Sequence, residues 1–169
     1  MDYLDGIRGS LDDYTWDQLQ EISLKIKAAE TRSEAREIAK RYHLLDADGH
    51  IPYPCTKRVK LTNGLEVGAQ LVGIRHDELL DGTGKAGLTF MFDAGIAERN
   101  AAAEPPSAGW AVCELREWLD GDGLKLLPNK LRALIKSVKK VSNNAGAANS
   151  ASCLSELPAT LWLPAMVEL

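Results

Sequence analysis

The sequence has few cysteines and aromatic residues, and it lacks a long apolar run. Its 169 residues include three cysteines and 6% aromatic residues. Cys55, Cys113 and Cys153 are odd in number, widely separated and without Cys-x-x-Cys spacing, which argues against a disulfide framework and a zinc site. The first residues, MDYLDGIRGS, contain no apolar run, so we expect neither a secretory signal nor a membrane anchor, and the chain is compatible with the cytoplasm.

The net charge of the chain is small and negative. A formal charge of −4 gives no general attraction to a phosphate backbone, because binding there requires many Lys and Arg side chains. Lys136, Lys139 and Lys140 form a basic cluster, which is too small to change this expectation and is typical of a solvated helix or strand end. We therefore expect no nucleic-acid partner and no insertion into a membrane.

The N-terminal part contains the start signals of two helices. A composition of 45% hydrophobic and 26% charged residues is typical of a globular protein, and the length suits one domain. After an N-terminal tail at residues 1–14, Thr15 begins a capping box, and Thr31 repeats the signature. Apolar residues at helical spacing follow each start, so residues 15–45 are predicted to form a helical hairpin.

Alternating apolar and polar residues predict strands in the middle of the chain. Residues 56–76 indicate a β-hairpin. A three-residue loop at positions 62–64 places Val59 opposite Val67 and makes both faces of the hairpin consistent. Residues 88–92 alternate in the same way and predict a third strand.

The last third of the chain is predicted to contain two helices and a strand. One helix opens at residues 109–110 and ends at the Asp-Gly-Asp-Gly run of residues 120–123. Apolar residues at helical spacing predict another helix over residues 127–138, and residues 161–163 indicate a strand. The fold class is therefore α+β: a small, mainly antiparallel sheet with two or more helices over residues 56–169, forming one compact unit with the helical hairpin.

Two polar motifs raise the question of catalysis. Residues 81–85, DGTGK, resemble the end of a phosphate-binding loop, but such a loop needs Gly in place of Leu79 and Ser or Thr in place of Ala86. The glycines of the motif therefore indicate a loop that needs a flexible backbone. His76 next to Asp77 and Glu78 could form a general-base pair, and Cys113 is a conceivable nucleophile, since such groups are separated in sequence but can meet in the fold.

His76 and Cys113 also have structural explanations that need no catalysis. A polar strand end accounts for His76, and a small buried thiol accounts for Cys113. A hydrolase or transferase that depends on Cys113 or His76 is thus an alternative function. None of the three histidines has a second nitrogen or sulfur ligand at helical spacing, so we expect no bound metal. We also expect no cofactor, and we assign no residue a catalytic role.

Several segments resemble an uncharacterised bacterial family. They are residues 71–77 (LVGIRHD), 84–90 (GKAGLTF), 109–110 (GW), 115–119 (LREWL), Asn143-Asn144 and 161–164 (LWLP). Through these segments the chain is similar to a domain of unknown function met in surface, secreted and prophage-associated proteins of Gram-positive gut bacteria. The resemblance implies a C-type-lectin-like or sulfatase-modifying-factor-like fold, whose C-terminal half this chain does not contain, and a binding role on a cell surface or a phage particle.

These observations favour a non-enzymatic recognition or adhesion module. The predicted ligand contacts are the ring of Trp110, the guanidinium of Arg116 and the amides of Asn143 and Asn144, because such groups suit anionic or polyhydroxy ligands. We expect the partner to be an unidentified ligand such as a carbohydrate or a protein. A further alternative is a structural assembly subunit that self-associates through a strand edge near Leu161.

Overall fold

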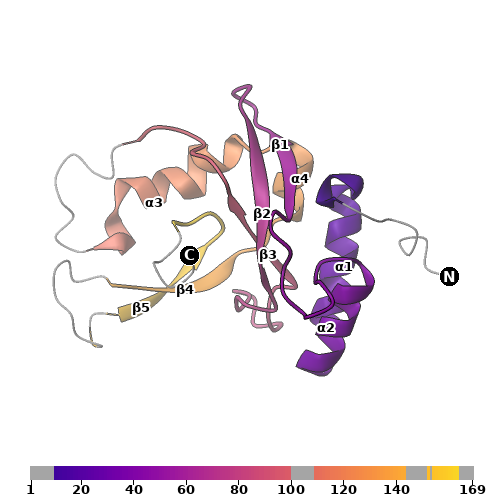
Figure 1. The fold of residues 1–169 in the computed structure, drawn as a ribbon. Helices are drawn as coiled ribbons and strands as arrows, with labels where there is room; N and C mark the ends of the chain where they lie inside the picture. Colours follow the sequence, from indigo (N-terminus) through magenta and orange to yellow (C-terminus); the bar gives the residue numbers. More distant parts are fainter. Residues whose placement is uncertain (1–9, 100–108, 144–151, 153, 164–169) are drawn as a thin grey trace.

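The computed structural model describes residues 10–99, 109–143, 152 and 154–163. It has the predicted α+β class, in which an N-terminal helix pair accompanies an antiparallel three-stranded sheet and an antiparallel two-stranded sheet (Figure 1). The elements are η2 (Leu11–Asp13), α1 (Trp16–Ala28), α2 (Arg32–Arg41), β1 (Thr56–Lys60), β2 (Glu66–Ile74), β3 (Leu88–Phe92), η3 (Trp110–Val112), α3 (Glu114–Trp118), η4 (Leu119–Gly123), α4 (Asn129–Leu134), β4 (Val138–Asn143) and β5 (Leu154–Ala159).

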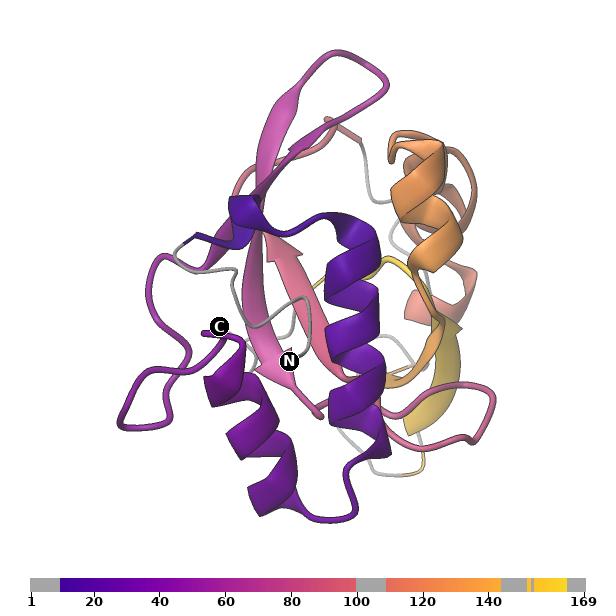
Figure 2. The same ribbon diagram turned by 90° about the vertical axis from the view of Figure 1, so that its right-hand side faces the viewer.

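Both helices of the N-terminal pair begin at the predicted caps. Thr15 Oγ1 accepts a hydrogen bond from the Gln18 amide at 3.2 Å, and Gln18 Oε1 accepts one from the Thr15 amide at 2.8 Å. Thr31 Oγ1 accepts from the Glu34 amide at 3.1 Å. The two helices lie side by side over one face of the three-stranded sheet (Figure 2).

The inward faces of the helix pair form a core with the sheet. Ile22 and Ile26 of α1 are fully buried in it, and Leu71 of β2 belongs to the same cluster. Removing this apolar surface from water is the main force that joins the helices to the sheet. Gly87 packs so tightly on α1 that a Cβ atom there would collide with the backbone carbonyl of Ser23.

The β-hairpin has the predicted register. Val59 of β1 lies opposite Val67 of β2, and the Leu61 amide donates to the Leu65 carbonyl at 2.8 Å. Gly64, with a φ of 89°, provides the left-handed position that this short loop requires. β3 pairs with the other edge of β2, so the order of the sheet is β1-β2-β3.

A second core lies between this hairpin and α4. The backbone amide of Thr62 donates to the Leu126 carbonyl at 2.8 Å and ties the tip of the hairpin to the segment before α4. The buried members of this core are Val59, Leu61, Val67, Ala69, Leu127 and Leu131.

The helix after Gly109 differs from the prediction. η3 is a short 3₁₀ helix, and α3 continues directly into the π-helical turn η4, so the Asp-Gly-Asp-Gly run at residues 120–123 does not end it. Gly123 is buried against Trp118, and a Cβ atom there would lie 3.1 Å from a ring carbon. The helical backbone thus continues through this run, and Gly123 packs on the ring of Trp118 five residues earlier.

The helix predicted over residues 127–138 is shorter than expected. α4 ends at Leu134, and Ile135 has an extended backbone with φ −69° and ψ 140°. Val138 instead begins β4 and pairs with Ala159. The apolar spacing up to Val138 fits a helix, but distant pairing partners decide the structure of that residue.

The strand predicted at residues 161–163 is misplaced. The strand of this region is β5, and residues 161–163 follow it outside any strand. β5 lacks a clear apolar alternation because most of its residues are exposed, so its sequence does not mark it as a strand. Pro158 within β5 has no amide proton to donate, which makes this strand a poor template for edge pairing.

Candidate functional site

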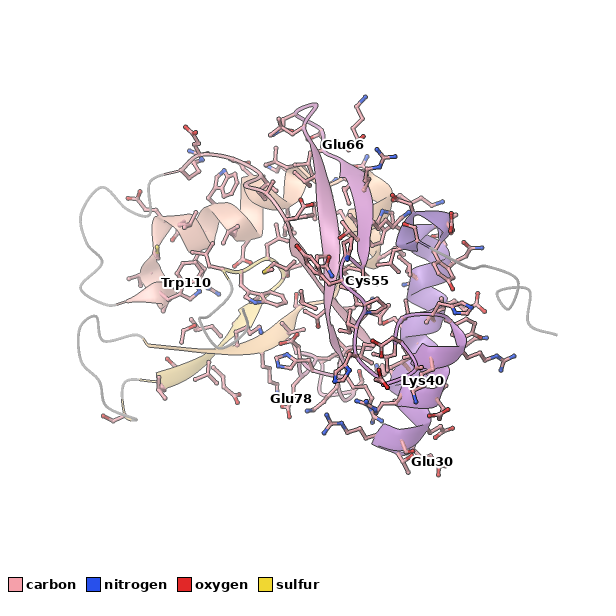
Figure 3. All side chains as sticks on the ribbon, viewed as in Figure 1. Glu30, Lys40, Cys55, Glu66, Glu78 and Trp110 are labelled. Atoms are coloured by element: carbon pink, nitrogen blue, oxygen red, sulfur yellow. The ribbon has the colours of Figure 1, made fainter. Side chains whose placement is uncertain are left out.

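The two sheets meet at a seam formed by residues 77–87 and residues 136–140. Leu79, in the loop after β2, forms an antiparallel bridge with Val138 of β4. Figure 3 labels Glu78, the neighbour of Leu79, beside β4 and below the three-stranded sheet. The seam thus joins the segment between β2 and β3 to a strand much later in the chain.

A buried carboxylate, Asp77, anchors the seam. Its side chain is only 4% exposed. Oδ1 of Asp77 accepts a hydrogen bond from Lys140 Nζ at 2.6 Å, and Oδ2 accepts one from Thr89 Oγ1 at 2.7 Å. The carboxylate therefore fastens the loop to both β4 and β3, and its two hydrogen-bonded oxygens offset the cost of removing the charge from water.

Opposing effects act on the pKa of Asp77. Desolvation raises this pKa, but the hydrogen bonds from Lys140 and Thr89, together with the positive charge of Lys140, outweigh burial. The pKa of Asp77 therefore lies below its ordinary value of 3.8. At neutral pH the side chain is ionised and forms a fixed ion pair with Lys140.

Two further side chains border this ion pair. Lys140 Nζ lies 4.4 Å from the centroid of the Trp162 ring, which is within the range of a cation–π contact. His76 Nδ1 lies 3.3 Å from Asp77 Oδ1, but the His76 side chain is 60% exposed. The buried pair consequently has an aromatic neighbour and an imidazole that faces solvent.

Two hollows border the seam, each with a volume of about 230 Å³. Pockets that enclose a drug-sized molecule usually measure roughly 300–1,000 Å³, so these hollows suit a group that projects from a larger ligand. One hollow is lined by Leu80, Asp81, Lys136 and Ser137, and the other by Glu78, Leu79, Gly82, Gly84, Lys85 and Lys139.

Lysines outnumber acidic residues in these hollows. Lys85, Lys136 and Lys139 form no ion pair with another residue in the part of the chain that the structure describes. Lys27 reaches the seam from α1 and donates to Thr83 Oγ1 at 2.6 Å. Hydrogen bonds from Thr83, aided by the charges of Lys27 and Lys136, hold the pKa of Asp81 below its ordinary value.

Three charged side chains of the seam share one face. Glu78 is exposed beside the buried Leu79, and it lies directly opposite Lys85, so these two side chains point the same way. On β4, Lys139 follows the buried Val138 and points to the opposite side from it. The Lys139 amide donates to the Glu78 carbonyl at 2.8 Å, which makes these two residues neighbours across the seam.

Arg116, a contact residue predicted from the sequence, is engaged by the protein itself. Its guanidinium donates to the Ala111 carbonyl at 3.4 Å and to the Pro158 carbonyl at 3.2 Å. A further nitrogen–oxygen distance of 3.7 Å links it to Asp120, and the side chain is 19% exposed. Arg116 therefore ties η3, β5 and η4 together.

The other three predicted contacts lie in different settings. Trp110 opens η3 and is half-buried where η3 contacts β4, on the β4 side of α3 (Figure 3). Asn143 ends β4 and pairs with Leu154 of β5. Asn144 lies outside the described residues. Among the four, the structure describes side chains only for Trp110 and Arg116.

The residues proposed for catalysis differ in their access to solvent. Cys113 is 4% exposed, and a nucleophile has to reach its substrate, so this burial weighs against a role for its thiol. His76 is exposed.

Within the described ranges, no group of three or more His, Cys, Asp or Glu side chains could hold a metal ion. None of the helices in those ranges is long and apolar enough to span a membrane.

The sequence contains the lysines of the seam without showing that they belong together. Lys85 belongs to the glycine-containing motif that fails as a phosphate loop, and Lys139 belongs to a basic cluster that is typical of a solvated end. The anchoring pair, Asp77 and Lys140, is separated by 63 positions. One local signal could have indicated part of the seam. The apolar Leu79 follows the polar Glu78, and such alternation is typical of a strand.

Comparisons with known proteins leave the function to be argued from this geometry. No protein-family model, curated protein or solved structure matches the chain.

Proposed function

We propose that the protein is a non-enzymatic recognition module whose ligand binds over the seam. The observation that carries this proposal is that Lys85, Lys136 and Lys139, which lack ion-pair partners among the described residues, line the two hollows. An ammonium group that no ion pair engages among the described residues is available to an anionic or hydroxyl-bearing ligand. The geometry thus supports binding at the seam.

A rigid support under the loop favours a binding role. Asp77 fastens the loop to β4 through Lys140 and to β3 through Thr89. Gly82 and Gly84 have φ values of 73° and 110°, a backbone conformation that residues other than glycine rarely adopt. Binding residues are common on loops that a rigid scaffold positions.

A cell surface or a phage particle is the setting that suits this function. The segments that resemble the uncharacterised bacterial family include residues 71–77 and 84–90, which contain or flank the loop of the seam. The resemblance supports a carbohydrate or a protein as the ligand. The resemblance supports a cell surface or a phage particle by analogy alone.

Binding arrays of glycans and peptides, probed with the labelled full chain, test the proposal. For the strongest ligand found, we expect a Lys85→Ala/Lys139→Ala variant to bind about tenfold or more weakly, because hydrogen bonds to charged groups are among the stronger polar contacts. A second variant carries alanine at Trp110, Arg116 and Asn143, and we expect it to retain binding wherever circular dichroism shows a folded chain. Undiminished binding by the folded lysine variant would place the ligand elsewhere.

The contact between His76 and Asp77 favours a second candidate function, a histidine-dependent hydrolase or transferase. A carboxylate on Nδ1 orients an imidazole and leaves Nε2 available for proton transfer. Chromogenic ester and phosphoester substrates test this candidate, with His76→Gln as the control. Turnover that the substitution abolishes supports an enzyme, whereas equal rates in both proteins contradict it.

A further inference from the structure

The outer face of the seam carries a carboxylate beside two ammonium groups. Glu78 lies between Lys85, its bridge partner, and Lys139, its neighbour on β4. All three residues line the same hollow. Within the described part of the chain, no ion pair joins them, so a carboxylate between two ammonium groups is available to a bound molecule.

We infer that the seam binds an acidic polysaccharide, an inference that rests on the proposed recognition function. The ammonium groups of Lys85 and Lys139 pair with acidic groups of the ligand. Glu78, which can only accept hydrogen bonds when ionised, binds sugar hydroxyls between those groups. A chain of acidic sugars carries both negative charges, which suit the lysines, and hydroxyl donors, which suit the carboxylate.

The same pattern disfavours a nucleic acid. Phosphate backbones bind through the accumulated charge of several Lys and Arg side chains. Here Glu78 and Asp81 interrupt the lysines along the seam, so the lysines form no continuous basic surface for a phosphate backbone in the described part of the chain. The small volume of each hollow, about 230 Å³, also suits a projecting group of a polymer better than an enclosed small molecule.

Isothermal titration calorimetry with the full chain tests the inference on four probes. Short oligogalacturonates carry carboxylates, heparin-derived oligosaccharides carry sulfates, maltooligosaccharides are neutral, and a single-stranded oligonucleotide supplies phosphates. We expect binding to at least one acidic sugar and much weaker binding to the other two probes. Lys85→Gln and Lys139→Gln should each weaken that binding by about three- to tenfold. Lys60→Gln, at an exposed lysine of β1, is the matched control and should leave it unchanged.

Glu78→Gln separates hydroxyl recognition from simple charge attraction. If Glu78 accepts hydrogen bonds from sugar hydroxyls, the substitution weakens binding, although it removes a negative charge. Tighter binding by this variant would overturn the polysaccharide assignment and leave the seam as the site. If neither acidic sugar binds, the inferred ligand class is wrong. The proposed recognition function would still stand, because the glycan and peptide arrays test it with other ligands. If an acidic sugar binds equally well to both lysine variants, the inference and the proposed site are both wrong.

Discussion

Lys140 Nζ lies 2.6 Å from Asp77 Oδ1, although the two residues are 63 positions apart in the sequence. Their side chains are 17% and 4% exposed, so water and salt screen this ion pair less than pairs at the surface. The pair closes the loop after β2 onto β4. It thereby fixes the backbone that carries Glu78, Lys85 and Lys139, and the binding proposal depends on this rigidity.

Asp77→Asn should lower the free energy of unfolding by about 3 kcal/mol, because it removes the carboxylate that pairs with the largely buried ammonium group of Lys140. Urea denaturation at neutral pH measures the change. The matched control is Glu66→Gln, which removes a carboxylate from an exposed contact with Arg58 and should cost at most about 0.5 kcal/mol.

A double variant, Asp77→Asn/Lys140→Met, should recover part of the stability lost in Asp77→Asn, because it also removes the largely buried ammonium group from beside the neutral amide. The same urea experiment compares the two variants. A double variant less stable than Asp77→Asn would mean that Lys140 stabilises the fold mainly through other contacts, such as the Trp162 ring.

The stability that Asp77 provides should fall as the solution becomes acidic. Its pKa in the folded protein lies below the ordinary value of 3.8, so the folded state binds this proton less readily than the unfolded chain does. The contribution is complete well above the unfolded pKa and is lost as pH falls through the folded pKa. The stability difference between the unsubstituted protein and Asp77→Asn should therefore shrink between pH values of about 6 and 3. A constant difference across that range would contradict the lowered pKa.

Gly87→Ala should destabilise the protein by about 2 kcal/mol, because its methyl group would collide with the backbone of α1 at Ser23. Gly95→Ala is the control, since a Cβ atom there meets no heavy atom within 4 Å. Thermal denaturation of both variants checks the result. Equal melting temperatures would show that α1 can move away from residue 87 without cost.

Thr15→Ala should cost about 1 kcal/mol, because the substitution removes the side-chain oxygen that accepts from the Gln18 amide at the start of α1. Thr15→Ser keeps an oxygen at that position and should retain most of the stability. Urea denaturation of the two variants distinguishes loss of the cap from loss of the methyl group. Equal losses in both would assign the effect to the methyl group.

Local signals predicted the first half of the fold well. The Thr15 cap lies within three residues of its partner, and the Val59–Val67 pair follows from alternation together with a short glycine-containing loop. Interactions of this kind depend on neighbours in the sequence, so pattern alone locates them.

Long-range contacts explain what the sequence did not reveal. Val138 continues a helical spacing but joins a strand, because its partners Leu79 and Ala159 are distant in the chain. For the same reason, nothing near Asp77 in the sequence identifies Lys140 as its counter-ion. The candidate site at the seam depends on this second kind of contact, so local patterns in the sequence could not locate it.

Mapping of amide chemical shifts by NMR tests most directly whether an acidic polysaccharide binds at the seam. A short oligogalacturonate is titrated into the isotope-labelled full chain. The largest shifts are expected at Glu78, Lys85 and Lys139, with little change at Lys60 on β1. Shifts concentrated around Trp110 instead would contradict binding at the seam and would favour the region predicted from the sequence.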